Sequence, residues 1–172
     1  RLGLFRPGAP DSGRVDVALR RGRIPIHSVV SAELMPDRVG YIKVVRFARN
    51  THEEFEEALF NLYEAGAERF VLDLRGNGGG LLNESVAIVN LFVSKGTEIV
   101  STRGKDEKWN KSYTALGRPT APDMPLVVLI DGSSASASEI VSGTLQDLDR
   151  AVIVGMESFG KGLVQQTKDM AF

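Results

Sequence analysis

The sequence predicts an α/β domain built on a largely parallel sheet with flanking helices. Strand-like and helix-like patterns alternate along the chain, which is typical of strands joined by helical crossovers. Residues 126–130 are apolar throughout, as expected of a strand that is buried on both faces. The 172 residues, 42% hydrophobic and 25% charged, suffice for one folded domain with a real core.

The first part of the chain is predicted to form a hairpin followed by a third strand. Residues 2–6 are mostly apolar and precede a turn rich in proline and glycine, and residues 14–19 alternate between polar and apolar side chains. Such alternation is typical of half-buried strands. Residues 40–47 are the next strand candidate. We expect the hairpin, about residues 1–20, to be separate from the domain over residues 21–172.

The first helix is predicted at residues 51–65. Thr51 and Glu54 have the spacing of a capping box, and Gly66 is a suitable stop. Apolar side chains recur on one face of this segment, as in an amphipathic helix. A strand at residues 70–74 follows and ends in a glycine-rich loop.

The second half of the chain continues the alternation. A helix follows the glycine-rich loop, with an apolar stripe made of Leu82, Val86, Val89 and Val93. Residues 101–124 are polar and are expected to cross the surface. The buried strand at residues 126–130 leads into a helix over residues 136–147, and residues 151–154 give the last strand.

Composition excludes several classes of function. The net charge is −1, from 21 basic and 22 acidic residues, which gives no electrostatic footprint for nucleic acid or an anionic membrane. The chain has no cysteine and two histidines, so a thiolate or multi-histidine metal site is not expected. No run approaches the roughly 20 apolar residues of a membrane span. The chain begins with Arg1, and we expect it to be a fragment of a longer protein.

Two loops combine residues that can carry chemistry. The glycine loop (residues 76–80) contains four glycines and an asparagine, and its flexible backbone can turn amides toward a negative charge. The serine loop (residues 132–136) and the residues just after it contain four serines. Each loop follows a buried strand and precedes a helix, so both are expected at the carboxyl edge of the sheet, where open α/β folds place their sites. The glycine loop is equally compatible with a flexible turn.

Ser136 is the candidate nucleophile. It alone among these serines has a glutamate, Glu139, at capping-box spacing, which places its oxygen at the positive end of a helix. The amide of Ala137 would then lie beside it as one donor of an oxyanion hole. The alternative, that Ser136 only caps the helix, is left open by this loop alone.

Lys161 is the candidate base for Ser136. It is flanked by glycines, and a lysine that loses its water on burial can act as a base near neutral pH. In an extended segment Gln165 would point to the same side and could orient the amine. The alternative is an exposed lysine in a glycine turn. Neither His27 nor His52 has a sequence cue for a site.

Residues 155–161 have the Gly-x-x-x-x-Gly-Lys spacing of a phosphate-binding loop. That motif needs Ser or Thr at the next position, where this chain has Gly162, and the residues that follow favour a strand rather than the required helix. Nucleotide binding is therefore not expected.

Three ordered motifs resemble the carboxy-terminal processing (tail-specific) proteases. Residues 73–82, Asp-Leu-Arg-Gly-Asn-Gly-Gly-Gly-Leu-Leu, are similar to the family's Asp-Leu-Arg-x-Asn-x-Gly-Gly signature. Residues 134–140 resemble its nucleophile motif, and residues 159–165 resemble its lysine motif. The order of the motifs and the 25-residue step from Ser136 to Lys161 are also the family's.

The resemblance implies a fold related to the ClpP/crotonase superfamily and a serine endopeptidase that cleaves proteins near their carboxyl termini. No metal or other cofactor is implied. The partner would be a protein or peptide substrate bound through its C-terminus, and an oligomer is compatible with the family. The location would be the bacterial periplasm, the cell envelope or the extracellular space. The implied residues are the nucleophile Ser136, the base Lys161 and its support Gln165, with oxyanion donors from Ala137 and from Gly79 or Gly80.

The chain departs from that family in three respects. A PDZ domain usually precedes the core, whereas here only residues 1–20 resemble its end. The core over residues 21–172 is expected to be truncated at its C-terminus, and Gly78 replaces the commoner proline. Two alternatives follow: a non-catalytic module that binds peptides, and a crotonase-like acyl-CoA enzyme that uses the glycine-loop amides. The paired serine and lysine motifs disfavour the acyl-CoA enzyme.

Overall fold

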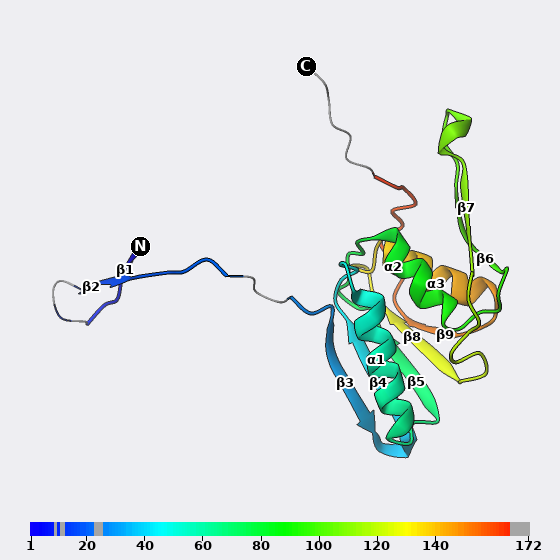
Figure 1. Cartoon of the computed structure of the whole chain (residues 1–172), viewed down its shortest axis with the longest axis horizontal. Helices are drawn as coiled ribbons and strands as arrows, with labels where there is room; N and C mark the ends of the chain where they lie inside the picture. The colour runs from blue at the N-terminus through cyan, green and yellow to red at the C-terminus, as the bar shows by residue number, and fades with distance from the viewer. Residues whose placement is uncertain (9, 11–12, 23–25, 166–172) are drawn as a thin grey trace.

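The computed structural model describes residues 1–8, 10, 13–22 and 26–165 (Figure 1). The main sheet contains, in spatial order, β3 (Val29–Met35), β4 (Val39–Val44), β5 (Arg69–Asp73), β8 (Leu126–Ile130) and β9 (Val152–Gly155). β3 is antiparallel to β4, and all other neighbours in this sheet are parallel. The predicted α/β class, with a largely parallel sheet and flanking helices, is confirmed.

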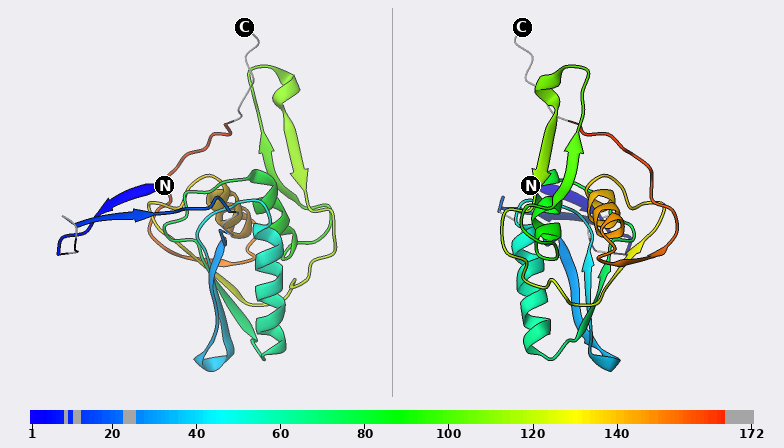
Figure 2. Two further views of the ribbon diagram at one scale, coloured as in Figure 1. Left: turned by 60° about the vertical axis from the view of Figure 1, so that its left-hand side comes forward. Right: turned by 90° about the vertical axis from the view of Figure 1, so that its right-hand side faces the viewer.

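The helices pack against this sheet and against one another. The α-helices of the described residues are α1 (Thr51–Glu64), α2 (Leu82–Asn90) and α3 (Ala137–Asp147). α1 lies on β3 and β4, α2 contacts both α1 and α3, and α3 reaches β9 (Figure 2). Short 3-10 helices occur at η2 (Pro36–Arg38), between β3 and β4, and at η3 (Glu107–Trp109).

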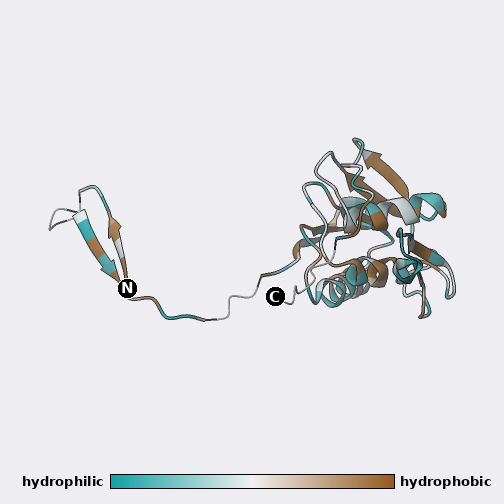
Figure 3. Ribbon diagram, turned by 90° about the horizontal axis from the view of Figure 1, so that it is seen from above, coloured by the Kyte–Doolittle hydropathy of each residue, from teal (hydrophilic) through white to brown (hydrophobic). Residues whose placement is uncertain are grey.

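The core lies between the helices and one face of the sheet, whose strands are largely hydrophobic (Figure 3). Alternate residues of the three central strands, β4, β5 and β8, point to this face and are buried, among them Ile42, Val44, Phe70, Leu72, Leu126 and Val128. Gly40 belongs to the same row, and a Cβ there would lie 2.4 Å from the Phe70 ring. Glycine at this position therefore lets the Phe70 ring pack directly on the β4 backbone.

The parallel register brings the two candidate loops together. Asp73 at the end of β5 is paired with Leu129 of β8, so both strands end at the same edge of the sheet. The chain then enters the glycine loop after β5 and the serine loop after β8. The Gly76 amide donates to the Asp131 carboxylate at 3.0 Å, which joins the two segments where they leave the sheet. The predicted location of both loops at the carboxyl edge follows from this register.

The start of α1 differs from the prediction. Thr51 is the first helical residue and Asn50, with a left-handed φ of 75°, is the N-cap, so the predicted capping box of Thr51 and Glu54 is wrong. The Glu54 carboxylate instead accepts from the amides of Ser28 and Val29, at 2.8 and 3.1 Å. This tertiary partner outcompetes the local one because it satisfies amides at the start of β3.

Two strand regions were not predicted. β3 is an edge strand with mostly exposed side chains, so its hydrophobic pattern is weak. The stretch expected to be irregular contributes an antiparallel hairpin of β6 (Glu98–Thr102) and β7 (Lys111–Thr114), which projects away from the sheet (Figure 1). Residues 163–165, which were expected to form a strand, have no regular secondary structure, and the same holds for residues 156–162.

The predicted N-terminal hairpin is present. β1 (Leu2–Phe5) and β2 (Arg14–Val17) pair antiparallel in a two-stranded sheet of their own. The assignment of residues 1–20 to the end of a PDZ domain stays a prediction. Within the described residues, no helix has the length and apolar character needed to cross a membrane.

Candidate active site

Asn77 holds the glycine loop against the serine loop. Its backbone carbonyl accepts from the Ala135 amide at 3.1 Å and from Ser138 Oγ at 2.9 Å. Its side-chain Nδ2 donates to the Val44 carbonyl of β4 at 2.9 Å. The residue is completely buried. One asparagine therefore fixes both loops relative to the sheet.

The glycines of the glycine loop lie against the backbone beside Ser136. A Cβ on Gly79 would lie 2.5 Å from the Ala135 oxygen and 2.8 Å from the Ala137 nitrogen. The φ of Gly79 is also positive, at 94°, so glycine is required there for two reasons. The Gly79 amide donates to Asn77 Oδ1 at 2.9 Å and is therefore occupied.

The amide of Gly80 differs in this respect from that of Gly79. Among the described residues, no hydrogen-bond acceptor engages the Gly80 amide or the Ala137 amide. Ala137 is the first residue of α3, where the amides have no partner within the helix. Of the two glycine-loop donors left open by the sequence, Gly80 is the one whose amide remains available.

Ser136 occupies the N-cap of α3 with an unusual backbone conformation. Its φ is 56° and its ψ is −111°, a region that residues with a side chain rarely adopt. Such strain is concentrated at functional sites, where the surrounding structure holds it in place. The start of α3 at Ala137 agrees with the sequence prediction.

Glu139 joins Ser136 to the segment that carries Lys161. Its carboxylate accepts from the Ser136 amide at 2.6 Å, which forms the glutamate half of the predicted capping box. The same carboxylate accepts from the Gly160 amide at 2.6 Å, from the Lys161 amide at 3.2 Å and from Ser158 Oγ at 3.0 Å. Burial would raise the pKa of Glu139, but these donors outweigh it and lower the pKa below its ordinary value.

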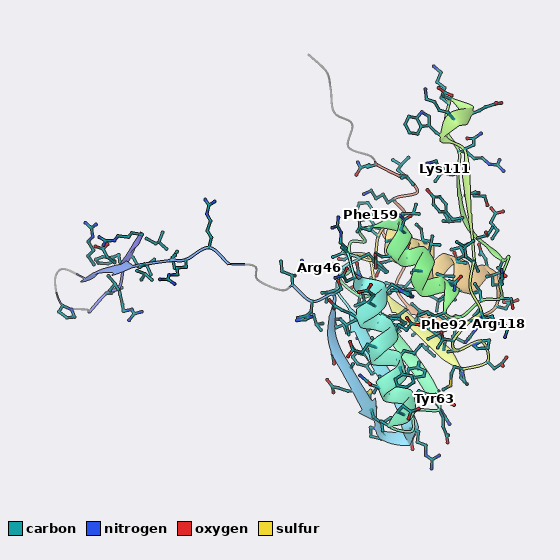
Figure 4. The ribbon with its side chains drawn as sticks, in the orientation of Figure 1. Arg46, Tyr63, Phe92, Lys111, Arg118 and Phe159 are labelled. Carbon is teal, nitrogen blue, oxygen red and sulfur yellow. The ribbon has the colours of Figure 1, made fainter. Side chains whose placement is uncertain are left out.

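The lysine segment reaches the same pocket as the serine. Lys161 Nζ donates to Gln165 Oε1 at 3.3 Å, as the sequence suggested. Phe159, labelled in Figure 4, begins this segment, and its amide donates to the Ser134 carbonyl at 2.9 Å. Within the part of the chain that the structure describes, no hydrogen bond links Ser136 Oγ to Lys161 Nζ.

A pocket of about 720 Å³ collects most of the predicted site residues. Its lining includes Ser136, Lys161, Gln165, Gly79 and Gly80. Ala137 is not part of the lining, because its side chain is buried on the core side of α3. The pocket is therefore lined by residues that carry a hydroxyl, an amine and, at Gly80, a free backbone amide.

A buried carboxylate supports the glycine loop from below. Asp73 is completely buried and accepts from Tyr41 Oη at 2.6 Å, Lys43 Nζ at 3.1 Å and Arg75 Nη2 at 2.7 Å. Burial raises the pKa of Asp73, but the hydrogen bonds from Arg75, Tyr41 and Lys43 outweigh it and hold the pKa well below its ordinary range. Lys43 also donates to the Arg75 carbonyl at 3.4 Å, just before the glycine loop begins.

Sequence reasoning missed the wider roles of three residues. Glu139 was predicted only as a helix cap, although it also binds the lysine segment. Asn77 and Asp73 were noticed only as parts of a motif. The available signal in the sequence was a polar side chain within a glycine-rich stretch, for Asn77, and within an apolar stretch, for Asp73. Both side chains are buried in the structure.

The remaining sequence hypotheses concern phosphate and metal binding. Residues 162–165, the last that the structure describes, form no helix, whereas a phosphate-binding loop requires a helix to begin directly after its lysine. Among the described residues, no group of three or more His, Cys, Asp or Glu side chains could hold a metal ion.

Comparison with known proteins identifies the family of the chain. The family model described as Peptidase family S41 matches residues 38–172, which is most of the chain. The chain belongs to peptidase family S41. It is 43% identical over 150 residues to the carboxyl-terminal-processing protease of Synechocystis sp., covering 84% of this chain and 34% of that protein. It is 33% identical over 169 residues to the carboxy-terminal processing protease CtpA of Bacillus subtilis, covering 98% of this chain and 35% of that protein.

A solved S41-like structure gives the same result. The photosystem II D1 C-terminal processing protease superposes with a TM-score of 0.70 at 32% identity, covering 95% of this chain and 45% of that chain. The predicted resemblance to carboxy-terminal processing proteases is confirmed. The chain spans about a third of the length of the curated S41 relatives named above and under half of this solved chain.

Proposed function

We propose that this S41 chain is the catalytic core of a serine endopeptidase in which Ser136 is the nucleophile and Lys161 the general base. The observation that carries this proposal is the Glu139 carboxylate, which binds the backbone amides of both residues. A residue that holds nucleophile and base segments together supports a shared catalytic role for them. The proposed substrates are proteins cut near their carboxyl termini, because the relatives are named for that processing.

The proposed reaction begins when Ser136 Oγ attacks a peptide carbonyl and its proton passes to the neutral amine of Lys161. The carbonyl oxygen becomes negatively charged and accepts from the amides of Ala137 and Gly80. The C–N bond then breaks, and Lys161 returns the proton to the leaving amine. Water attacks the acyl-enzyme in the second half of the reaction and gives its proton to Lys161. The bond between the acyl carbon and Ser136 Oγ then breaks, Lys161 returns the proton to Ser136 Oγ, and the acid product leaves.

The remaining residues are positioning residues in this proposal. Gln165 accepts a hydrogen bond from the Lys161 amine and so limits its rotation. Gly79 contributes no amide to the oxyanion, since its N–H is bound by Asn77. Its role is to let the glycine loop approach the backbone of Ala137 closely enough to place the Gly80 amide.

The test is covalent labelling with an activated acylating probe that reacts with serine nucleophiles, measured as an acylation rate across pH. We expect the wild-type chain to be labelled at Ser136, since the proposed base is in place to accept the proton of the hydroxyl. The variants Ser136→Ala and Lys161→Ala should abolish this labelling. Ser133→Ala, an exposed serine in the serine loop, is the matched control and should label like the wild type.

Two results would contradict the proposal. Labelling that persists in Ser136→Ala would show that another group reacts. Equal labelling of the wild type and Lys161→Ala would show that Lys161 is not the general base. If the chain is not labelled but still binds peptides, the non-catalytic binding module becomes the better assignment.

A further inference from the structure

One face of α3 forms a wall of the pocket that contains Ser136. Ser136, Ile140, Gly143 and Asp147 follow one another at intervals of three or four residues, and all four line this pocket. Residues at such intervals share one face of a helix. The wall therefore runs from the candidate nucleophile along the helix, and Gly143 lies on it about 10 Å from Ser136, given a rise of 1.5 Å per residue.

Gly143 is a glycine that neither conformation nor packing requires. It lies in the interior of α3 and has no positive φ. A Cβ added there would meet no other heavy atom within 4 Å. Gly40 is the contrasting case, since a Cβ at that position would collide with the Phe70 ring.

Glycine in a helix interior destabilises the fold relative to alanine. Since the backbone conformation and the neighbouring atoms would both accept alanine, the missing Cβ has no structural benefit in this chain. The absence of a side chain at Gly143 affects the pocket instead, because it leaves open the space that a side chain would otherwise fill at this point of the wall.

The stretch of the pocket wall that leads from Ser136 to Gly143 is mainly apolar. Ile99 of β6 is buried and lines the pocket, and Ile140 lies one turn before Gly143 on the same face of α3. The hydroxyl of Thr144 is turned away from the space, because it donates to the Ile99 carbonyl at 2.7 Å. This stretch of the wall offers dispersion contacts, which suits an apolar side chain. The exposed carboxylate of Asp147 lies one turn beyond Gly143, at the far end of the wall from Ser136.

We propose that Gly143 determines which substrate side chain is accepted next to the scissile bond, by leaving room for a large apolar residue. This inference rests on the proposed function, since it takes Ser136 as the attacking group. The side chain that flanks the attacked carbonyl extends along the α3 wall, where a small one ends before Gly143 and a large one covers it.

The experiment uses activated ester substrates that differ only in the acyl-side residue, which is alanine, leucine or phenylalanine. The second-order rate constant for acylation is measured with each ester for the wild type, Gly143→Ala and Gly143→Leu. Gln146→Leu places the same leucine side chain at an exposed position of α3 that does not line the pocket, and serves as the matched control. Thermal unfolding is followed for every variant.

We expect Gly143→Ala to lower the phenylalanine-to-alanine rate ratio by about 10-fold, since discrimination of this order arises from one or two methylene groups. Gly143→Leu should lower the ratio further, and Gln146→Leu should leave it unchanged. Gly143→Ala should also raise the unfolding temperature by about 2–4 °C, because alanine favours the helix. A lost rate in a more stable protein cannot come from unfolding.

The outcomes separate this inference from the function on which it rests. A wild-type chain that is acylated, with the same rate ratio in Gly143→Ala and Gly143→Leu, overturns the role of Gly143 alone. A wild-type chain that none of the three esters acylates overturns the proposed function, and the role of Gly143 falls with it.

Discussion

Replacing Glu139 by glutamine tests whether this residue assembles the site. The carboxylate accepts from backbone amides on both sides of the pocket, at Ser136 and at Gly160 and Lys161. Glutamine has nearly the same shape but only one acceptor oxygen. Whichever way its amide group turns, an NH₂ group faces a backbone N–H that the carboxylate formerly bound.

The size of the effect follows from these contacts. One charge-assisted hydrogen bond is lost and one backbone amide is left without its acceptor, which together amount to about 2 kcal/mol. The loss acts on the docking of the lysine segment against the Ser136 N-cap. A change of about 2 kcal/mol lowers the equilibrium constant for assembly of the site by about 30-fold, and it lowers the acylation rate by up to the same factor.

Two measurements check this prediction. The acylation rate of Glu139→Gln is compared with that of the wild type, and amide hydrogen exchange is followed at Gly160 and Lys161. Exchange at both amides should accelerate, because their acceptor is weakened. The lowered pKa of Glu139 also sets the direction with pH: its contribution is present above the ordinary value of 4.5 and is lost as pH falls through the lower folded value.

Glu157→Gln is the matched control for this substitution. Glu157 is exposed and precedes the same lysine segment, so its loss of charge should change neither rate nor exchange. An unchanged acylation rate in Glu139→Gln, together with unchanged exchange at Gly160 and Lys161, would refute the assembly role.

Two further substitutions address the support of the glycine loop. Asp73→Asn should lower the free energy of unfolding, measured by urea denaturation at neutral pH, by about 3 kcal/mol, since it breaks a buried ion pair. Because the pKa of Asp73 is lowered in the folded protein, this loss of stability should be complete above the ordinary pKa of 3.8 and should shrink as pH falls through the lower folded value. A loss of stability that does not vary with pH would contradict this prediction. Asn77→Ala removes both side-chain hydrogen bonds, to Val44 and from Gly79, and should lower stability by about 2–4 kcal/mol and the acylation rate by about 100-fold. The same substitution at exposed Asn61 on α1, Asn61→Ala, is the control. If Asn77→Ala lowers stability but not the acylation rate, Asn77 has only a structural role.

Local patterns in the sequence were sufficient for much of the fold. The apolar run of β8 and the helix that begins after Ser136 depend on neighbours within a few residues, and both lie where they were predicted. The β6–β7 hairpin was not predicted, because its strands are short and largely exposed and so lack a hydrophobic pattern. β3 was missed for the same reason.

The parts of the site that were missed depend on partners far apart in the chain. Glu139 meets the Lys161 amide across 22 residues, and Asn77 meets the Val44 carbonyl across 33. A capping-box pattern does not reveal whether a glutamate serves its own helix or another segment. Glu139 does both, whereas Glu54 serves only a distant strand.

The contact between the two loops also determines when the chain can acquire its chemistry. The hydrogen bond from Ser138 Oγ to the Asn77 carbonyl joins residues 61 positions apart, with α2 and the β6–β7 hairpin in between. Closing so long a loop is entropically unfavourable until β5 and β8 pair. A chain in which β8 has not yet paired with β5 therefore lacks the contact that holds the serine loop against Asn77. In the proposed peptidase, formation of the active site would then have to follow completion of the sheet.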